Sequence, residues 1–245
     1  MIPDTRQFPL AVVTGAAHRL GRAIALGLAA EGYAIGLHYH RSQTAARQTA
    51  ADIRDLGVPA LLYQADLAQP EEIQTLFEAV GREPYPLKVL VNSAAVMQRG
   101  NLGDLAVADW NTSMDVNLRA PWLCSRLAAG LMQPGGGVII NISDTGARKT
   151  WSGFPAYAVT KAGLEMLTRL LARTYAPGIR VNAVAPGLVL PAEGMPADEW
   201  QRLAQRLPLK RAGTPQDIVE AVLYLIRSEY ITGDILTVDG GNQLL

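Results

Sequence analysis

A tyrosine, a lysine and an aspartate stand at spacings that suit proton transfer. Tyr157 and Lys161 are four residues apart, and residues at i and i+4 share one face of a helix. A nearby ammonium lowers a tyrosine pKa, so we expect Tyr157 to donate a proton near neutral pH. Asp144 precedes Tyr157 by thirteen residues. Its charge would raise the tyrosine pKa instead, which predicts a coupled pair. The alternative is a surface tyrosine beside a solvated lysine.

The segment from Thr14 to Gly21 has the composition of a phosphate-binding turn. It reads Thr-Gly-Ala-Ala-His-Arg-Leu-Gly, follows a short apolar run and opens a helical pattern. A glycine turn between a strand and a helix directs main-chain N–H groups and the helix N-terminus at a pyrophosphate. The alternative is a tight turn without a ligand. The predicted dinucleotide contacts are Gly15, His18, Arg19, Leu20 and Gly21.

The end of the second predicted strand indicates which nicotinamide cofactor is used. It reads His38-Tyr39-His40-Arg41-Ser42, with no acid to accept hydrogen bonds from an adenosine ribose. Arg41 can hold a 2′-phosphate and Ser42 can donate to it. We therefore predict NADPH, bound here by His40, Arg41 and Ser42. Zinc held by His38 and His40 is the alternative, but no cysteine or third ligand cluster supports it. No metal is predicted, and both histidines are assigned to the phosphate side.

Short runs rich in Val, Ile and Leu alternate with longer helical patterns along the chain. Strands without polar alternation are buried on both faces, as in a parallel sheet covered by helices. This predicts an α/β fold, a single-domain Rossmann-type doubly wound parallel sheet of about seven strands with helices on both faces. Strands are expected at 9–14, 34–39, 59–65, 87–92, 137–142, 179–185 and 235–238. Helices are expected at 19–32, 42–57, 70–82, 109–132 with a break near Asn117, 154–175, and 215–227 with Thr214 as its N-cap.

The composition is that of one ordinary globular domain over residues 1–245, with 49% hydrophobic and 18% charged residues. The net charge of zero gives no indication of a nucleic-acid partner. The only cysteine, Cys124, lies in an apolar helical stretch, which fits a reducing compartment. The N-terminus lacks the layout of a signal peptide, and no apolar run reaches membrane-spanning length. We expect a cytoplasmic protein that acts on a small molecule, without a membrane partner.

Seven motifs together resemble the short-chain dehydrogenase/reductase family over essentially the full chain. They are Thr14-Gly15…Gly21, Asp66-Leu67, Asn92-Ser93-Ala94-Ala95, Asn117, Tyr157…Lys161, Pro186-Gly187 and Val238-Asp239-Gly240-Gly241. The resemblance implies catalytic roles for Tyr157 as proton donor, Lys161 on the nicotinamide ribose and Asn117 in a water relay. It also implies that Asp66 contacts the adenine and that Asn92 supports the cofactor pocket. Further implied cofactor contacts are Leu67, Ser93, Ala94, Tyr157, Lys161, Pro186, Gly187 and Leu188.

Two departures from the family pattern resemble the pteridine reductases. Arg19 stands where the turn usually has its central glycine, and Asp144 stands where the family usually has serine. The stretch 38–42 is similar too, as are Gly187-Leu188, Met195-Pro196 and Trp200. This resemblance implies that Asp144 and Tyr157 act together on a pterin ring. It also implies that Arg19 reaches both cofactor phosphate and substrate.

The chemistry of a carboxylate agrees with that assignment. A serine hydroxyl can donate to a developing alkoxide, whereas an ionised Asp144 cannot donate and would repel it. A pterin offers amino and ring N–H donors, and reducing its C=N bond requires a proton on nitrogen. We therefore predict NADPH-dependent hydride transfer to a dihydropterin or dihydrofolate. The predicted substrate contacts are Arg19, Met97, Asp144, Phe154 and Tyr157.

Some features leave other functions open. The pteridine reductases that the chain resembles carry phenylalanine where Met97 stands, and Phe154 and Trp151 either supply aromatic surface or fill the core. An NADPH-dependent carbonyl or 3-ketoacyl reductase is therefore the alternative. A non-catalytic NADPH-binding regulator would not need Tyr157, Lys161 and Asn117.

Two structural expectations bear on the substrate and on assembly. Ser143 adjoins Asp144, but neighbours after a strand point to opposite sides, which favours Asp144 in the site. Residues 188–212 are expected to form a substrate lid. The family resemblance implies a homotetramer that pairs the helices at 109–132 and 154–175.

Overall fold

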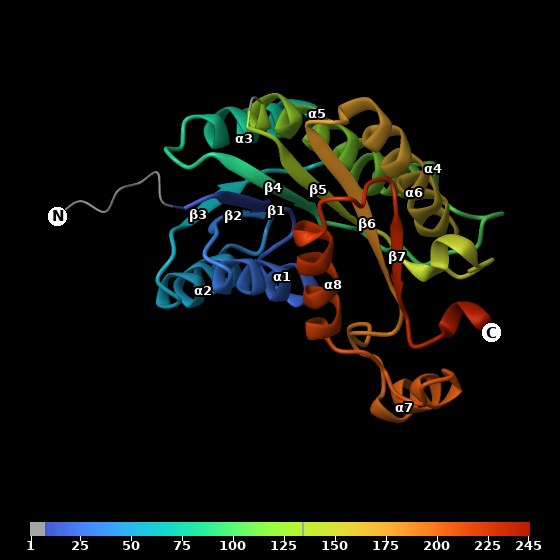
Figure 1. The fold of residues 1–245 in the computed structure, drawn as a ribbon. Coiled ribbons are helices and arrows are strands. Elements are labelled where there is room, and N and C mark those ends of the chain that lie inside the picture. The colour runs from blue at the N-terminus through green and yellow to red at the C-terminus, as the bar shows by residue number, and fades with distance from the viewer. Residues whose placement is uncertain (1–7, 134) are drawn as a thin grey trace.

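The computed structural model describes residues 8–133 and 135–245 of the chain. They form one parallel sheet of seven strands in the order β3-β2-β1-β4-β5-β6-β7 (Figure 1). The predicted doubly wound α/β fold is confirmed. The strands are β1 (Leu10–Val13), β2 (Ala34–Tyr39), β3 (Ala60–Gln64), β4 (Leu87–Asn92), β5 (Gly137–Ile142), β6 (Ile179–Pro186) and β7 (Ile235–Val238).

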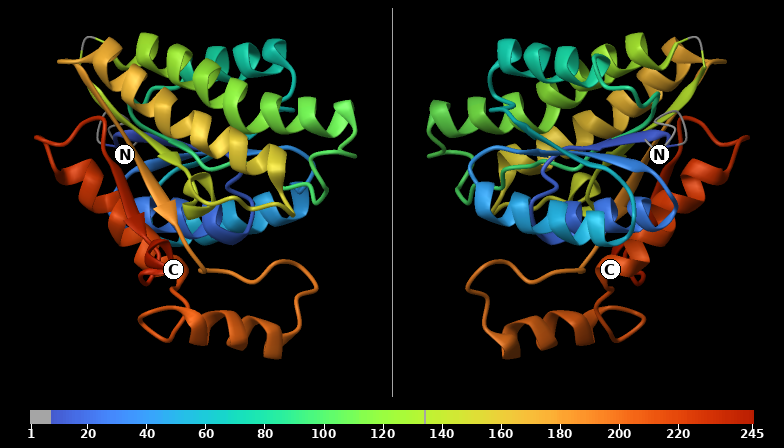
Figure 2. Two further views of the ribbon diagram at one scale, coloured as in Figure 1. Left: turned by 90° about the vertical axis from the view of Figure 1, so that its right-hand side faces the viewer. Right: turned by 90° about the vertical axis from the view of Figure 1, so that its left-hand side faces the viewer.

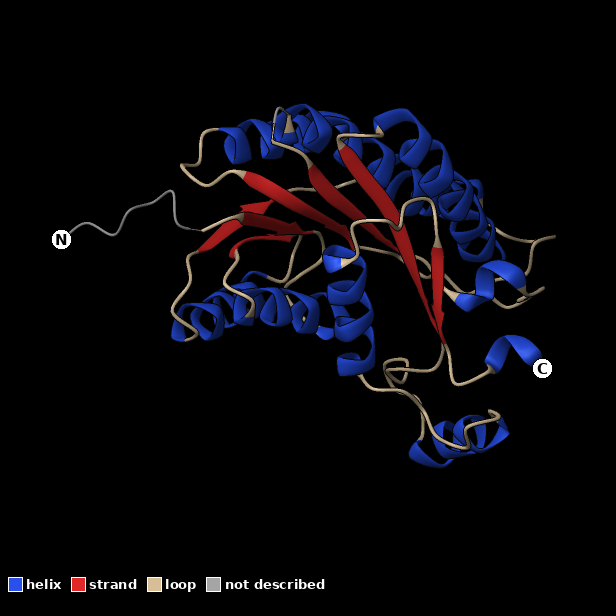
Figure 3. Cartoon of the chain, in the orientation of Figure 1, coloured by secondary structure: helices blue, strands red, loops and turns tan. Residues whose placement is uncertain are grey.

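Helices cover both faces of the sheet, as Figures 1 and 3 show. One face is covered by α1 (Arg19–Ala30), α2 (Gln43–Asp55) and α8 (Pro215–Arg227), and the other by α3 (Pro70–Gly81), α5 (Ala120–Met132) and α6 (Pro155–Tyr175). Successive side chains of a strand point to opposite faces. In β1, Ala11 and Val13 therefore pack into one core while Leu10 and Val12 pack into the other.

The strand order changes direction at the centre of the sheet. Strand β1 pairs with β2 on one side and with β4 on the other, so the winding direction reverses between β1 and β4. Ligands of open α/β sheets bind beyond the carboxyl ends of the strands at such a reversal. The turn after β1 and the loop after β4 both lie there.

The long helix expected at 109–132 is interrupted, as predicted. It consists of α4 (Val107–Met114), a π-helical turn η2 (Asp115–Arg119) and α5. A π turn inserts one extra residue per turn and is often found at functional sites. Asn117 lies in this turn with a fully buried side chain.

The segment between β6 and α8 projects from the body. It contains a helix missed by the sequence analysis, α7 (Ala197–Arg206), which lies apart from the sheet in Figures 1 and 2. Ala204 is the only buried residue of α7, and the fully buried Leu207 follows it. Helix α8 then begins with the predicted cap, because Thr214 and Asp217 form a capping box. The lid role of 188–212 stays a prediction.

Among residues 8–133 and 135–245, no helix is both long enough and apolar enough to cross a membrane.

Candidate active site

Tyr157 and Asp144 meet at the carboxyl end of β5. Tyr157 lies in the first turn of α6, and Asp144 caps the short 3-10 helix η3 (Thr145–Arg148). The Tyr157 hydroxyl donates to Asp144 Oδ2 at 3.1 Å, and the Gly146 N–H donates to Asp144 Oδ1 at 2.6 Å. Each carboxylate oxygen therefore has its own donor, which orients the group toward the phenol.

Ser143 points the other way. Its hydroxyl donates to Glu165 Oε1 at 3.3 Å and is buried. Neighbouring residues in extended backbone alternate sides, and Asp144 has extended backbone angles. The structure thus places Asp144, and not Ser143, beside Tyr157.

The pKa of Tyr157 is raised well above its ordinary value, firstly by burial and then by the charge and hydrogen bond of Asp144. The expectation that Lys161 would lower this pKa is therefore wrong for this structure. Burial penalises the phenolate, and the group bonded to the hydroxyl is a carboxylate. Tyr157 accordingly keeps its proton at neutral pH and is placed to donate it.

Asp144 and Lys161 also have shifted pKa values. Burial raises the pKa of Asp144, against lowering contributions from the Gly146 N–H, Lys161 and Tyr157. Burial lowers the pKa of Lys161 to about 8, and Asp144 partly offsets the shift. The Lys161 ammonium donates to the Ile142 carbonyl at 2.7 Å and lies 5.4 Å from the centroid of the Tyr157 ring. Three titratable groups therefore share one desolvated site.

Asn117 braces the loop after β4 against α6. Its Oδ1 accepts from Val96 N at 2.8 Å, and its Nδ2 donates to Val96 O at 2.8 Å and to Thr160 Oγ1 at 3.3 Å. Both amide protons are thus bonded within the protein. The predicted part of Asn117 in a water relay stays a prediction.

The turn after β1 packs closely against the loop after β4. Gly15 has a φ of +67°, and a Cβ there would lie 2.9 Å from Ala94 Cα, so only glycine fits without strain. Thr14 Oγ1 accepts from the N–H groups of Ser93 and Ala94 at 2.9 and 3.0 Å. The residues predicted to bind cofactor from these two segments are therefore brought together.

His38 is not on the phosphate side, contrary to the sequence-based assignment. It is 2% exposed, its Nδ1 accepts from Gly15 N at 3.1 Å, and its Nε2 lies 3.0 Å from Ala65 O. The Gly15 N–H can only donate, so Nε2 carries the proton. Burial lowers the pKa of His38 to about 4, which keeps the ring neutral. Its role is to hold the glycine turn against the end of β3.

The other predicted adenosine-side residues gather beyond β2 and β3. His40 and Arg41 are exposed and Ser42 is partly exposed, and His40 Nε2 lies 3.8 Å from Asp66 Oδ2. Leu67 is buried beside them. No three His, Cys, Asp or Glu side chains of the described residues are grouped to hold a metal ion.

Asn92 lies behind the cofactor side of the site. It is 3% exposed, and its Nδ2 donates to Ser125 Oγ at 3.2 Å and to Asn141 Oδ1 at 2.8 Å. These bonds tie β4 to α5 and β5. The predicted role of Asn92 in the cofactor pocket stays a prediction.

Arg19 and the end of β6 connect the glycine turn to the projecting segment. Arg19 has a φ of +53° and donates to the Pro191 carbonyl at 2.7 Å. A left-handed non-glycine residue costs on the order of 1 kcal/mol and often marks a functional position. At the exit of β6, Gly187 follows Pro186 and precedes Leu188, and a Cβ on Gly187 would lie 2.7 Å from Asp239 Cβ.

An aromatic cluster borders Tyr157. The ring centroids of Trp151 and Phe154 are 4.9 Å apart, and those of Trp151 and Tyr157 are 6.3 Å apart. Sequence analysis missed Arg99, whose guanidinium lies 5.7 Å from the Phe154 centroid. Met97, on the same loop as Arg99, is 44% exposed. The predicted substrate residues Met97 and Phe154 thus lie on two segments that meet where Gly100 N donates to Gly153 O at 3.0 Å.

Glu165 and Arg148 were also missed. Arg148 Nε lies 3.1 Å from Glu165 Oε2, and the Glu165 side chain is 8% exposed. One signal for this pair was present, since Glu165 follows Tyr157 by eight residues and therefore shares its helix face. A carboxylate on a buried face requires a partner.

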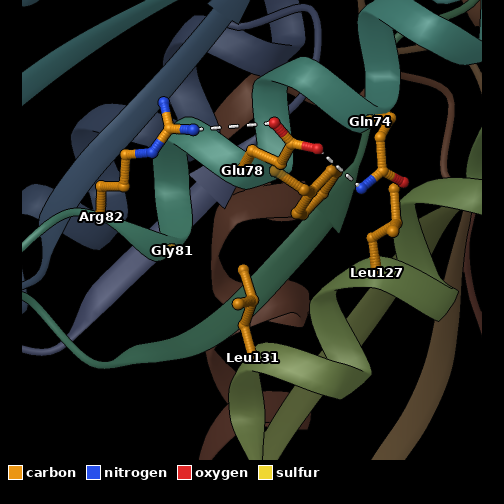
Figure 4. A pocket seen from close by; sticks show the side chains of 7 residues that line it. Gln74, Glu78, Gly81, Arg82, Leu127 and Leu131 are labelled. Atoms are coloured by element: carbon orange, nitrogen blue, oxygen red, sulfur yellow. Dashed lines mark hydrogen bonds and ion pairs between the residues drawn. The ribbon is translucent and has the colours of Figure 1, made fainter.

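A surface groove lies away from these residues, between α3 and α5 (Figure 4). Its polar side chains bond to each other along α3. Gln74 donates to Glu78 at 3.2 Å, and Arg82 pairs with Glu78 at 3.7 Å. These groups belong to one exposed helix face, and the groove is not the candidate site.

Sequence comparison places the chain among reductases. A family model described as Enoyl-(Acyl carrier protein) reductase matches residues 15–243. The chain is 37% identical to a granaticin polyketide synthase putative ketoacyl reductase 2 of Streptomyces violaceoruber, with 100% of both chains covered. It is 33% identical to a 3-oxoacyl-[acyl-carrier-protein] reductase FabG of Staphylococcus epidermidis, covering 94% of this chain and 97% of the relative.

Solved structures show the same fold. The FolM Alternative dihydrofolate reductase 1 from Brucella suis in complex with NADP has a TM-score of 0.92 and 33% identity, covering 98% of this chain and 97% of that one. A blue fluorescent protein from a metagenomic library, in complex with NADPH, has a TM-score of 0.88 and 35% identity, covering 95% and 97%.

Proposed function

This chain belongs to the short-chain dehydrogenase/reductase family, and we propose that it reduces a C=N bond of a dihydropterin or dihydrofolate with NADPH. The observation that carries the substrate class is the 3.1 Å hydrogen bond from Tyr157 to Asp144. A carboxylate in that place can accept N–H donors of a pterin, whereas it would repel the alkoxide formed from a ketone.

NADPH is the hydride donor, and the residues present suit it. Gly15 leaves room for close main-chain approach, and exposed His40 and Arg41 stand at the end of β2 with no acid at 38–42. The FolM structures contain NADP. The turn 15–21 would hold the pyrophosphate, residues 40–42 the 2′-phosphate, Asp66 and Leu67 the adenosine, and Lys161 the ribose.

The side chains divide the remaining work. Tyr157 holds its proton at neutral pH and delivers it to the substrate nitrogen. Asp144 accepts an N–H group of the substrate and, after Tyr157 has given up its proton, passes a proton from solvent back to Tyr157, directly or through water. Arg19 reaches both phosphate and substrate in this proposal, and its position on the turn and its hydrogen bond to the Pro191 carbonyl support that role. Met97 and Phe154 border the ring.

An NADPH oxidation assay tests the substrate class. Dihydrobiopterin, dihydromonapterin and dihydrofolate should be turned over, and a 3-ketoacyl thioester should be turned over far more slowly. The reverse ranking would reject the proposal. The variant Asp144→Ser makes the test sharper, because it should abolish most pterin reduction. The control is Glu78→Gln, which removes an exposed carboxylate on α3 and should leave pterin reduction unchanged.

A carbonyl or 3-ketoacyl reductase is the second candidate. The full-length similarity to ketoacyl reductases favours it, as does Met97 in place of an aromatic platform. On this candidate Asp144→Ser restores the usual hydroxyl donor, and ketone reduction should rise. A rise of that kind without any pterin activity in the parent enzyme would establish the second candidate.

We also propose that the enzyme is a homotetramer that pairs the helical segments 109–132 (most of α4, with η2 and α5) and 154–175 (α6) with their copies. These helices carry exposed apolar side chains, with Trp122 43%, Val159 47%, Met166 53% and Leu170 57% exposed. A hollow continues this surface, and it is lined by the apolar Met114, Leu118, Trp122 and Leu167 together with the charged pair Asp115 and Arg119. Light scattering of the wild type and of Met166→Glu tests the assembly, and a monomeric wild type would exclude it.

A further inference from the structure

The carboxylate of Glu165 holds both flanks of the loop that carries Asp144. Ser143, the residue before Asp144, donates to Glu165 Oε1 at 3.3 Å. Arg148, four residues after Asp144, lies 3.1 Å from Glu165 Oε2. The two oxygens of one buried side chain thus clamp residues 143–148 onto α6.

The clamp continues to the C-terminal end of the chain. Arg148 Nη1 donates to Thr237 Oγ1 at 3.1 Å and to Gln243 Oε1 at 3.4 Å. Next to it, the Lys149 ammonium donates to the carbonyl of Asn242 at 2.6 Å and to its Oδ1 at 3.0 Å. The loop is therefore tied to β7 and to η4 (Asn242–Leu244) as well as to α6.

The Arg148–Glu165 pair is not needed for stability alone, since only Glu165 is buried and the Arg148 side chain is 37% exposed. Burying an ion pair costs much of what its attraction returns, and apolar replacements of similar volume are often neutral or stabilising. What the Glu165 carboxylate adds is orientation of the loop, since each of its two oxygens fixes one residue of the loop, Ser143 or Arg148. Asp144 lies between those points with extended backbone angles.

We propose that Glu165 is a positioning residue that, through Ser143 and Arg148, aims the Asp144 carboxylate at Tyr157. A displacement of about 1 Å in a catalytic group can cost about a hundredfold in rate. Loss of the clamp should therefore lower kcat and leave NADPH affinity nearly unchanged, because Glu165 touches neither predicted phosphate segment. The inference rests on the proposed role of Asp144 in the site.

A double-mutant cycle tests the proposal with whichever substrate the wild type reduces. Glu165→Leu should lower kcat roughly tenfold or more in the wild type and less than about twofold in an Asp144→Ala background. The NADPH Kd, from cofactor fluorescence, should change less than about twofold in both backgrounds. Equal losses of kcat in the two backgrounds would overturn the proposal.

Two further measurements separate positioning from stability and from substrate choice. Asp52→Asn removes another Arg–carboxylate pair, Arg22–Asp52 at 2.6 Å, and should lower stability without lowering kcat. A crystal structure of Glu165→Leu should show the Tyr157–Asp144 hydrogen bond broken, whether or not a pterin is the substrate.

An unchanged hydrogen bond would refute the positioning role of Glu165 and would leave the proposed function untouched. Should Glu165→Leu not fold, Arg148→Met/Glu165→Leu removes both charges and answers the same question.

Discussion

The Tyr157 hydroxyl donates to Asp144 Oδ2 at 3.1 Å, in a site where Lys161 bonds to the main chain of β5 instead of to the phenol. The hydroxyl of Tyr157, the predicted proton donor, is therefore oriented by a carboxylate. An ionised carboxylate at this position would not stabilise an alkoxide, which is the basis of the proposed substrate class. The following predictions depend on this hydrogen bond and on the contacts around it.

Asp144→Asn should lower kcat/KM for a dihydropterin by about a hundredfold or more, the usual contribution of acid–base groups. Asparagine keeps the size of aspartate and one acceptor but cannot take up a proton. Steady-state rates of NADPH oxidation provide the measurement, with Glu78→Gln as the matched carboxylate-to-amide control. A loss of less than about threefold would remove Asp144 from the proton path.

The buried Lys161 should make stability rise with pH in the alkaline range. Its folded pKa is about 8, against an ordinary 10.5. Between these values the unfolded chain binds more protons, so the free energy of unfolding increases with pH, by an upper limit on the order of 3 kcal/mol. Urea unfolding at pH 8 and 10 measures it. Lys161→Met should lack this increment, and parallel pH curves for the two proteins would contradict the prediction.

Neutral His38 should make the fold sensitive to mild acid. Its folded pKa is about 4, against an ordinary 6.5. In that window the unfolded chain again binds more protons. The stability contributed by neutral His38 is therefore complete above about pH 6.5 and is lost as pH falls toward 4. Denaturant midpoints at pH 7 and 4.5 should differ less in His38→Gln than in the wild type. His18 is exposed, and His18→Gln should leave the difference between the two denaturant midpoints the same as in the wild type.

Arg19→Gly should stabilise the fold by about 1 kcal/mol while weakening NADPH binding. Glycine relieves the left-handed backbone at position 19, but the guanidinium and its bond to Pro191 are lost. Thermal unfolding and cofactor fluorescence measure the two effects. Limited proteolysis within 188–212 should also become faster. Lys210→Gly relieves a similar φ of +56° and should stabilise without the loss of NADPH affinity. Equal NADPH affinity in Arg19→Gly and the wild type would contradict the predicted phosphate contact.

The fold could be predicted, and candidate residues for the site could be proposed, because the signals in the sequence are local. Apolar runs without polar alternation indicate buried parallel strands, and the break at Asn117 and the cap at Thr214 depend on nearby residues. Helix α7 was missed because its residues are mostly polar and only Ala204 is buried. It therefore lacks the apolar content by which the other helices were identified. The predicted cofactor residues follow strand ends, which a parallel sheet gathers at one edge.

Only the tertiary structure decided what these residues do to one another. Local spacing indicates that Lys161 is near Tyr157, but the pKa of Tyr157 depends on burial and on a carboxylate from another element. The sequence around His38 suggests a contact with phosphate, yet the packing of three strand ends buries this histidine against Gly15. Glu165 and Arg148 meet across seventeen residues of chain. Spacing along the chain specifies which groups share a face, whereas desolvation and hydrogen-bond direction arise only when distant segments pack.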